Sequence, residues 1–560
     1  MLALAVVGLA LIFKLGNLPL LQPDEGRNTE VAREMKESGA WLTPTYDGIT
    51  YLDKPAFFFK TVALSLAAFG NNETAARLPS TLFGLALLAI TFAFCRHVFD
   101  ARCGVMAVTI IATMPLYIVF SRTVIFDMTL AFFVTAAIFA GYLAEESDGK
   151  SRRNWYLLGA LAAGLATLVK GPVGFLLPGL VLFVIHRVEG RVGVWQRFFA
   201  PLNLLIFFGV TLPWFIGLSL QHPDFPHYGL IEESFHRFTT TTFHRTQPFY
   251  FYALIILGLF LPWSFILPEA GVAAWKNKKI MTSADRLCVV WAVVVVIFFS
   301  LSKSKLPGYI LTVTVASGIL LARLFQTAMA NPNGKAARII FRSAITFTIL
   351  CLLVMTTAIV LAPRMGSLAK PLGLPQATAE DLGHHFFIPI ILLAGFAALG
   401  LLARSRRDAG LCFVIFAVFP PLLFGLNLNA IETVFNYKSA RPLAQKIQAL
   451  PPETKLAFLE CFPNGLPFYL NRTATLFTKD GRELTSSSNY ILYRLKNDPA
   501  WPANLVAVTN FDHWIAARSN QVYLVAREKD RPKLEAIQGV QPADIQPFTP
   551  QYLGVLLKVP

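Results

Sequence analysis

The chain has 560 residues, of which 55% are hydrophobic and only 15% are charged. This balance, with a mean hydropathy of +0.55, predicts a polytopic membrane protein and excludes a soluble globular one. The formal net charge of +16 is explained by basic loops that face anionic lipid head groups, and no feature calls for nucleic acid.

Apolar runs that are long enough to cross a bilayer recur along the first 427 residues. Reading runs of roughly 17 to 25 residues as helices predicts about thirteen transmembrane helices. They lie near residues 1–21, 80–98, 104–120, 124–144, 155–170, 172–187, 199–219, 250–270, 287–302, 308–325, 339–362, 386–404 and 410–427. The first run is kept as a helix, because no A-x-A-like cleavage site follows it.

Lysine and arginine collect in alternate loops between these runs, as they do in cytoplasmic loops. The basic residues of these loops are Arg96, Arg102, Lys150, Arg152, Arg153, Arg187, Arg191, Arg197, Lys276, Lys278, Lys279, Arg286, Lys335, Arg338, Arg342, Arg404, Arg406 and Arg407. If the N-terminus is cytoplasmic, all of them fall on the cytoplasmic side. An odd number of helices then places the loops 21–80, 220–249 and 363–385 and the segment 428–560 in the periplasm.

The segment 428–560 differs in character from the rest of the chain. Its stretches "KLAFLECF", "NYILYRL" and "NLVAVTNF" predict strands between Pro, Gly and Asn breakers. Because its only cysteine is Cys461, no disulfide framework is available to it. We expect a periplasmic mixed α/β domain that covers a cavity or helps to admit an acceptor.

The first long external loop opens with "LQPDEGRNTEVAREMKESG". This stretch predicts an amphipathic helix over residues 24–38, capped by Asp24 and ended by Gly39. In isolation, Asp24 would be a simple helix cap. Further along, "YLDKPAFFF" places Asp53 and Lys54 before an aromatic interfacial segment, where a solvated loop pair is the plain alternative.

Other ionisable groups accumulate at the same membrane face, in loops that are far apart in the sequence. They include Glu25, Arg27, Arg122, Asp127, Lys170, Glu232, Glu233, His236, Arg237, Arg245, Lys303, Lys305 and Tyr309. Charged groups at the ends of apolar helices are costly unless they are solvated or paired, so their accumulation predicts a shared polar cavity. We expect Asp24, Lys54 and Asp127 to line it.

The residue types indicate the chemistry of this cavity. Lysine and arginine at the lipid boundary suit a phosphate or pyrophosphate, and carboxylates suit a hydroxyl, an amine or a developing positive charge on a sugar ring. The sequence has no P-loop, GxSxG or HExxH motif, which argues against a nucleotide-driven pump or a serine hydrolase.

Five motifs, in order and spacing, carry a resemblance to a known family. They are "LQPDEGRNTEVAREMKESGAWLTP" with "YLDKPAFFF", the helix-opening Asp127, "LVKGPVGF", "ESFHRFTTTTFHRTQPFYFY" and "FFSLSKSKLPGYI". Together they resemble the bacterial aminoarabinose transferases of lipid A modification, which belong to the GT-C glycosyltransferases together with the protein O-mannosyltransferases. The resemblance covers nearly all of the membrane portion, and it implies a GT-C fold.

The resemblance also implies an activity. It is the transfer of 4-amino-4-deoxy-L-arabinose from undecaprenyl phosphate to a lipid A phosphate at the periplasmic face of the bacterial inner membrane, which confers resistance to polymyxin and cationic antimicrobial peptides. The family's acids fall on Asp24 and Asp127, and its lysine falls on Lys54. Asp53 stands where the enterobacterial pattern "FEKP" has Glu.

We therefore assign Asp24 and Asp127 as candidate catalytic residues, which orient the sugar, pair with its amine or stabilise oxocarbenium character. With a protein hydroxyl as the acceptor, Asp24 would instead be the general base. The candidate substrate-binding residues are Glu25, Arg27, Asp53, Lys54, Lys170, Glu232, Arg237, Lys303, Lys305 and Tyr309.

No cofactor is required for this chemistry, since Lys and Arg can assist phosphate departure. A divalent metal is the alternative, because Glu232 and His236 lie four residues apart, with His222, His227 and His244 near in sequence. The ligand spacing is not diagnostic. The other explanation is a helix face that contacts lipid head groups.

The residue pattern is compatible with other functions. A related transferase could use another polyprenyl-linked sugar or a protein acceptor. A transporter would place its charges near the membrane midplane between repeated halves, whereas here they gather at one face. A sensor or assembly protein would depend on residues 428–560 and tolerate loss of the loop charges. The expected partners are the lipid-linked donor, lipid A and inner-membrane lipids, and we expect a monomer.

Overall fold

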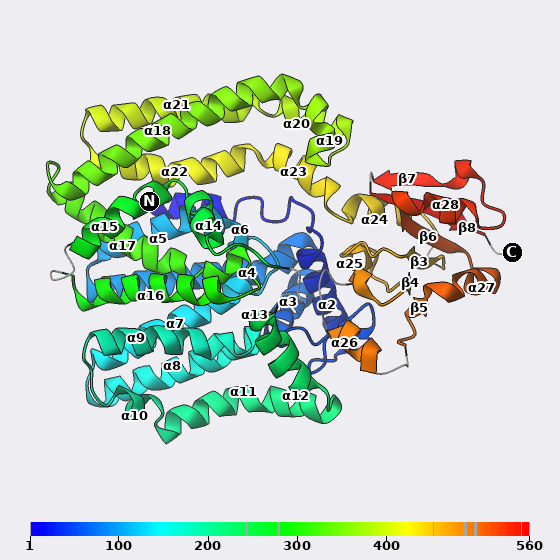
Figure 1. Ribbon diagram of the computed structural model, residues 1–560, viewed down its shortest axis with the longest axis horizontal. Helices are drawn as coiled ribbons and strands as arrows, with labels where there is room; N and C mark the ends of the chain where they lie inside the picture. The colour runs from blue at the N-terminus through cyan, green and yellow to red at the C-terminus, as the bar shows by residue number, and fades with distance from the viewer. Residues whose placement is uncertain are drawn as a thin grey trace.

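The computed structural model describes residues 2–240, 245–276, 281–451, 453–484, 490–497, 501–549 and 551–558. Long, roughly parallel helices form a bundle, and a smaller domain built on a β-sheet lies beyond one end of it (Figure 1). Helices α2 (Asp24–Ser38) and α3 (Phe57–Phe69) lie between the bundle and the sheet.

Among the described residues, eight helices are long and apolar enough to cross a membrane. They are α4 (Glu73–Val98), α7 (Asp127–Glu145), α11 (Pro201–Gln221), α16 (Ser283–Leu301), α17 (Val313–Ala330), α18 (Lys335–Leu361), α21 (Phe387–Ser405) and α22 (Ala409–Leu426). The pair α5 (Ala101–Thr113) and α6 (Pro115–Ser121), bent by 74°, makes a ninth if its two halves are counted as one span. Pro115 starts the second half, because proline disfavours helical geometry in the residue before it.

The predicted number of thirteen helices is not reached in this part of the chain, for identifiable reasons. The run at 1–21 forms only α1 (Leu2–Leu11), since Lys14 adopts a positive φ of 50°. The run at 250–270 is broken into α14 (Phe251–Leu259) and α15 (Leu267–Lys276), with Pro262 in the break.

Two more predicted runs form helices that are too polar or too short to be counted among the membrane-crossing helices. Helix α8 (Gly149–Lys170) is long but begins with a basic turn, and α9 (Val173–Val188) has only 16 residues. The predicted helix over residues 24–38 is confirmed as α2. As expected, Gly39 ends it with a φ of 68° and donates its N–H to the carbonyl of Met35.

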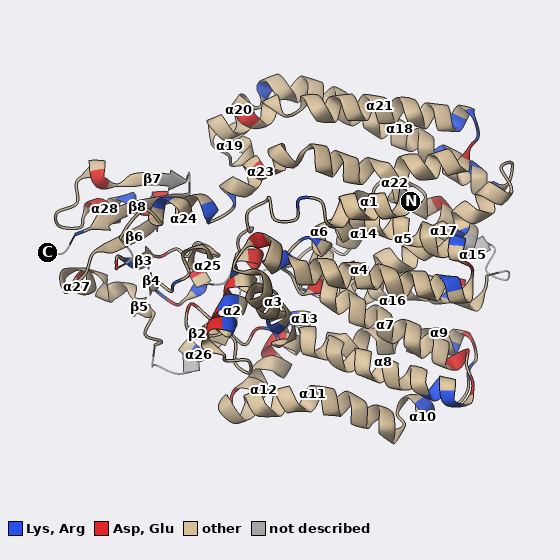
Figure 2. Cartoon of the chain, turned by 180° about the vertical axis from the view of Figure 1, so that it is seen from behind, with Lys and Arg blue, Asp and Glu red and all other residues tan. Residues whose placement is uncertain are grey.

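Charges avoid the middle of the bundle. Figure 2 shows the long helices almost free of blue and red, with Lys and Arg gathered at the end remote from the sheet. Both signs of charge gather around α2, between the bundle and the sheet. The two ends of the bundle therefore differ in chemistry.

The sheet has six strands in the order β5-β4-β3-β6-β8-β7. The pairs β5-β4, β4-β3 and β3-β6 are parallel, and the pairs made by β8 are antiparallel. The strands are β3 (Lys455–Leu459), β4 (Thr475–Thr478), β5 (Leu505–Ala507), β6 (Val522–Arg527), β7 (Gln546–Thr549) and β8 (Tyr552–Leu557). The helices of this part are α23 (Leu428–Tyr437), α24 (Arg441–Ile447), α25 (Leu466–Leu470), α26 (Tyr490–Asn497), α27 (Phe511–Ala516) and α28 (Arg531–Glu535).

The strand predictions for this domain were partly wrong. The stretch "KLAFLECF" contains β3, but residues 490–495 of "NYILYRL" lie in the helix α26. Its tyrosines Tyr490 and Tyr493 are three residues apart, a helical spacing, and both pack against Tyr228. The stretch "NLVAVTNF" is a strand only over Leu505–Ala507 and then turns into α27.

One hydrophobic core is shared between the sheet domain and the segments beside the bundle. It contains Val31 and Met35 of α2 and Phe59 of α3 together with Phe458 of β3 and Tyr490 of α26. Because burial of apolar surface is the main stabilising term in folding, the sheet domain and the first long loop are expected to depend on each other for stability.

Candidate functional site

A cavity of about 840 Å³ opens among the helix ends that face the sheet domain. Its apolar walls come mainly from α7, α9 and α11, with residues such as Leu130, Phe175 and Phe207. Its polar residues come from loops, helix ends and the π-helix η1 (Tyr228–His236). They include Asp53, Lys54, Asp127, Lys170, Glu233, Ser234, Arg237, Ser302, Ser304 and Tyr309.

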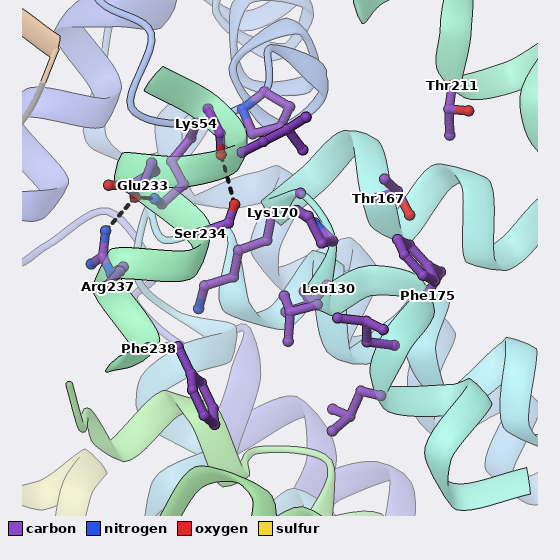
Figure 3. A pocket seen from close by; sticks show the side chains of 18 of the residues that line it. Lys54, Leu130, Thr167, Lys170, Phe175, Thr211, Glu233, Ser234, Arg237 and Phe238 are labelled. Carbon is purple, nitrogen blue, oxygen red and sulfur yellow. Dashed lines mark hydrogen bonds and ion pairs between the residues drawn. The ribbon is translucent and has the colours of Figure 1, made fainter. Parts of the chain in front are cut away.

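Glu233 of η1 joins two cations at this polar end. Its Oε1 accepts from Lys54 Nζ and from Arg237 Nη1, and Figure 3 shows both side chains converging on it. Lys54 is only 8% exposed. Burial lowers the pKa of Lys54 to about 8, although Glu233 raises it. Burial alone would raise the pKa of Glu233, but Arg237 and Lys54 lower it. The group therefore carries two positive charges against one negative charge and favours an anion.

Asp127 and Lys170 form a second pair in the same cavity. Asp127 is the first residue of α7 and Lys170 the last of α8, and Lys170 Nζ lies 2.6 Å from Asp127 Oδ1. Lys170 Nζ also lies 5.0 Å from the ring centre of Phe126, over which Lys54 Nζ lies at 5.8 Å. The Phe126 ring thus lies within reach of both ammonium groups.

Tyr309, in the 3-10 helix η4 (Pro307–Ile310), completes this end of the cavity. Its ring centre is 4.5 Å from Lys170 Nζ. Burial would raise the pKa of Tyr309, but Arg237, Lys170 and Arg245 together lower it to about 8. The direction of this shift reports a strongly positive local potential.

Asp24 lies beside the cavity and is absent from its lining. Its carboxylate pairs with Arg27, and its side chain is 45% exposed. Burial raises the pKa of Asp24, but Arg27, Arg245 and Arg237 outweigh it and lower the pKa. The predicted helix cap is wrong, since Pro23 holds the cap position and α2 has no side-chain capping bond. Lys54 and Asp127 do line one cavity as expected, and Arg237 links it electrostatically to Asp24.

Arg27, also predicted to bind substrate, is 7% exposed and lies with its guanidinium 6.0 Å from the ring centre of Tyr51. It faces Asp24 rather than the lining of the cavity.

Glu25, although adjacent in sequence, has a different environment. Its carboxylate accepts two hydrogen bonds of 2.9 Å from Arg77. It also accepts from the backbone N–H groups of Leu21 at 3.0 Å and Val124 at 3.1 Å. Glu25 is 2% exposed and has four donors, so its position indicates a structural role instead of the predicted substrate contact.

Asp53 lines the cavity and connects it with the sheet domain. Its Oδ1 accepts from the Tyr228 hydroxyl at 2.9 Å and from the backbone N–H of Tyr490 at 2.8 Å. Burial and the neighbouring Glu233 raise the pKa of Asp53. Its carboxylate is thus held by η1 and α26 at the cavity wall.

Lys305 and Lys303 are placed differently from the prediction. Lys305 is 6% exposed, and its Nζ donates to the carbonyls of Ser302 at 2.6 Å and Gln247 at 3.1 Å. The Lys303 side chain is exposed, and its backbone N–H donates to the carbonyl of Phe238 at 2.9 Å. Neither lysine lines the cavity.

The candidate metal ligands Glu232 and His236 form a partly exposed pair at 3.1 Å, outside the cavity. The described residues contain no group of three His, Cys, Asp or Glu side chains that could hold a metal ion. His222 and His227 contact the rings of Tyr490 and Tyr493, and His244 lies outside the described residues.

Glu233 connects Lys54 with Arg237, a role that the sequence does not predict. A signal was present, since Glu233 and Arg237 are four residues apart. Glu232 and His236 have the same spacing, and only the fold decides which pair faces the cavity. The contacts of Tyr228 and Tyr490 with Asp53 had no signal in the sequence.

Comparison with known proteins identifies relatives of this chain. The dolichyl-phosphate-mannose-protein mannosyltransferase family matches residues 53–216. An undecaprenyl phosphate-alpha-4-amino-4-deoxy-L-arabinose arabinosyl transferase of Edwardsiella ictaluri is 30% identical over 57% of the chain and 58% of its own length. The corresponding protein of Erwinia tasmaniensis is 30% identical over 70% of each chain.

The fold has close counterparts among solved structures. ArnT from Cupriavidus metallidurans bound to undecaprenyl phosphate superposes with a TM-score of 0.82 and 26% identity, over 99% of this chain and 96% of that one. Its apo form gives a TM-score of 0.81 at 25% identity, with the same coverage of both chains. The sequence match spans just over half of the length of the Edwardsiella relative, and the structural match extends over nearly the whole chain. The chain therefore belongs to the family of undecaprenyl phosphate-alpha-4-amino-4-deoxy-L-arabinose arabinosyl transferases, within the GT-C superfamily.

Proposed function

We propose that this chain is an integral membrane glycosyltransferase that moves 4-amino-4-deoxy-L-arabinose from undecaprenyl phosphate to a phosphate of lipid A. The observation that carries the proposal is a cavity with long apolar walls and a polar end that contains Lys54, Lys170 and Arg237. A polyprenyl phosphate has the same two parts. The names of the relatives and the undecaprenyl phosphate bound to the Cupriavidus protein support the donor.

In this proposal, the donor phosphate binds between the Lys54–Glu233–Arg237 group and Lys170. Three cations within one partly desolvated pocket provide charge-assisted hydrogen bonds that an anion can accept. Tyr309 adds a hydroxyl at the same end. Glu233 then serves as the counter-charge that holds Lys54 and Arg237 in place, and the polyprenyl chain lies along the apolar walls.

The reaction exchanges one bond for another at the anomeric carbon. An oxygen of the lipid A phosphate forms a bond to this carbon, the bond to the donor phosphate oxygen breaks, and undecaprenyl phosphate leaves with the electron pair. The acceptor phosphate is already anionic near neutral pH, so it needs positioning more than deprotonation. Lys54, Lys170 and Arg237 stabilise the charge on the leaving phosphate.

Asp127 is the better placed of the two candidate catalytic acids, because it lines the cavity beside Lys170. We propose that Asp127 stabilises oxocarbenium character on the sugar or pairs with the sugar amine. Asp24 lies at the edge of the site. We propose that it orients the acceptor or the sugar through the arginines around it. The proposal includes no metal, because Lys and Arg can assist the departure of the phosphate, and a metal at Glu232 and His236 is the alternative.

We further propose that the protein lies in the bacterial inner membrane as a monomer, with a cytoplasmic N-terminus and with the cavity and sheet domain in the periplasm. The gathering of Lys and Arg at the end of the bundle remote from the sheet (Figure 2) supports this orientation. Lipid A reaches the cavity from the outer leaflet in this arrangement. A protein hydroxyl acceptor or another sugar is the second candidate function, since the phosphate-binding groups would be the same.

The test uses a polymyxin-sensitive Gram-negative strain that lacks its own transferase but still makes the donor. The parent chain is expected to add aminoarabinose to lipid A, as read by mass spectrometry, and Asp127→Asn is expected to abolish the addition at equal expression. Glu232→Gln, a carboxylate outside the cavity on the same π-helix as Glu233, is the matched control and should retain it. Unmodified lipid A from a correctly inserted parent chain would contradict the proposal and would favour another sugar or a protein acceptor.

A further inference from the structure

One helix of the sheet domain, α26, contacts the wall of the cavity at Asp53. Tyr490, its first residue, is 2% exposed and uses two groups to contact other segments. Its backbone N–H donates to Asp53 Oδ1 at 2.8 Å, and its hydroxyl donates to Asp224 Oδ1 at 3.1 Å. Asp53 directly precedes Lys54, and Asp224 directly precedes α12 (Phe225–His227), which leads into η1.

An aromatic cluster reinforces these polar contacts. The ring of Tyr228 lies 5.2 Å from that of Tyr490 and 5.3 Å from that of Tyr493. Tyr228 is the first residue of η1, and its hydroxyl donates to the same Asp53 Oδ1 that Tyr490 binds. Aromatic pairs at such distances add stabilisation beyond their buried area. Tyr490 therefore holds both the segment that bears Lys54 and the helix that bears Glu233.

These two segments meet in the ion pair of Lys54 with Glu233 at the polar end of the cavity. The rest of the pair's environment is built from loops and a π-helix, which are less rigid than the long helices of the bundle. A contact from outside the bundle is therefore needed to fix their relative position.

We propose that the sheet domain is part of the active site, with Tyr490 as a positioning residue that holds Asp53 and the start of η1 and thereby sets the place of Lys54. This proposal rests on the proposed function for its consequence, namely that the donor phosphate binds at Lys54. The role of the domain is then to keep the phosphate-binding group assembled. The claim about position can be tested without any assay of transfer.

The experiment compares full-length Tyr490→Ala and Tyr490→Pro with the parent and with Tyr523→Ala. Proline is well tolerated at the first position of a helix, so Tyr490→Pro removes the N–H donor to Asp53 that Tyr490→Ala keeps. Tyr523, on the inner strand β6, is a buried tyrosine of the same hydrophobic cluster. Its truncation controls for loss of packing within the sheet domain.

The first readout is the rate at which an amine-reactive reagent labels Lys54, followed by mass spectrometry of the folded protein in detergent. Tyr490→Ala should increase the rate roughly fivefold, and Tyr490→Pro should increase it further, because local opening exposes the ammonium group. Tyr523→Ala should match the parent. Equal rates in all four proteins, or the same increase in Tyr523→Ala, would overturn the proposal.

The second readout is the dissociation constant of undecaprenyl phosphate, the product of the proposed reaction. It should rise roughly tenfold in Tyr490→Ala, equivalent to about 1.4 kcal/mol, and stay near the parent value in Tyr523→Ala. Faster labelling without weaker binding would overturn the positioning role. A parent chain that binds no undecaprenyl phosphate would contradict the proposed function instead, and the labelling rates would still decide the placement of Lys54.

Discussion

Lys170 Nζ lies 2.6 Å from Asp127 Oδ1 and thereby links the end of α8 to the start of α7. Each residue occupies the helix end where its charge is favoured, since helix N-termini attract anions and C-termini attract cations. The pair lines the cavity and lies against Tyr309. Of the two candidate acids, the one in direct contact with a lysine of the cavity is therefore Asp127.

Replacement of Asp127 by Asn tests this assignment. The amide keeps the shape of the side chain but removes the charge that faces Lys170 and the sugar, so transfer is expected to fall by ~10²-fold or more. The measurement is the fraction of lipid A that carries aminoarabinose at equal protein levels. Lys170→Arg, which keeps the positive charge, should retain more activity than Lys170→Met. Full transfer by Asp127→Asn would remove this carboxylate from the chemistry.

The pH dependence of donor binding follows from Lys54 and Tyr309. Below pH 8, Lys54 is mostly protonated, because its pKa is about 8, and it can hold a phosphate. As the pH rises through 8, the ammonium loses its proton and Tyr309, with a pKa also about 8, becomes an anion. Both changes weaken binding, so the dissociation constant of undecaprenyl phosphate should rise above pH 8.

Two variants separate these contributions to the pH profile. Lys54→Arg should stay charged throughout and leave only the part due to Tyr309, and Tyr309→Phe should leave only the part due to Lys54. A profile that is flat from pH 7 to 10 in the parent chain would exclude both residues from contact with the phosphate.

Much of this arrangement could be predicted from local sequence. The amphipathic helix at α2 and its end at Gly39 follow from the residue pattern, and the motif order indicated the family and the cavity residues Lys54 and Asp127. These features depend on neighbours in the chain. The number of membrane-crossing helices did not follow, since positive φ at Lys14 and the breaks at Pro115 and Pro262 shorten or bend apolar runs.

The division of labour among the carboxylates could not be predicted, because it depends on contacts between distant segments. Glu25 accepts hydrogen bonds from Arg77, 52 residues away, and Asp53 accepts one from Tyr490, 437 residues away. Neither partner is marked by spacing. The helix α26 was mistaken for a strand because a short aromatic and β-branched run favours both states.

Replacement of Glu25 is expected to lower stability, whereas replacement of Asp24 is not. Glu25→Gln leaves Arg77 buried without its counter-charge, and loss of one partner of a buried ion pair typically costs about 3–5 kcal/mol. The expected result is a lower unfolding temperature and less folded protein, with transfer per folded molecule nearly preserved. Asp24→Asn should do the opposite, with normal folding and reduced transfer. Equal thermal stability of Glu25→Gln and the parent would contradict the structural role.

Loss of the Lys305 side chain is expected to disturb the site, because this side chain bonds to backbone carbonyls. Its Nζ holds the carbonyl of Gln247, and its backbone N–H donates to the carbonyl of Arg245 at 3.1 Å. Burial lowers the pKa of Lys305, and no carboxylate bonds to its Nζ among the described contacts. Lys305→Met should therefore raise the Michaelis constant for the donor by roughly tenfold, since misplacement by about 1 Å is costly. Lys303→Met, in the same loop with an exposed side chain, is the control and should stay within about twofold, a surface effect.

A substitution at Gly26 tests how closely the sheet domain packs against α2. A Cβ at this position would lie 2.6 Å from the carbonyl oxygen of Asn464 and 2.7 Å from the backbone nitrogen of Gly465. Alanine favours an isolated helix by about 1 kcal/mol over glycine, so the helix alone would gain stability. The clash with backbone should dominate and cost about 1–3 kcal/mol. The expected result of Gly26→Ala is faster proteolysis of the sheet domain and reduced transfer, because α2 also carries Asp24 and Arg27.

The matched control for this substitution is Gly8→Ala in α1, where the added Cβ would meet nothing within 4 Å. It should leave proteolysis and transfer unchanged. If Gly26→Ala behaves like Gly8→Ala, the contact between α2 and the Asn464–Gly465 turn is looser than the structure shows. The shared core would then not couple the sheet domain to the site through α2. If only Gly26→Ala releases the domain, close packing at this glycine holds the first long loop and the sheet domain together as one unit.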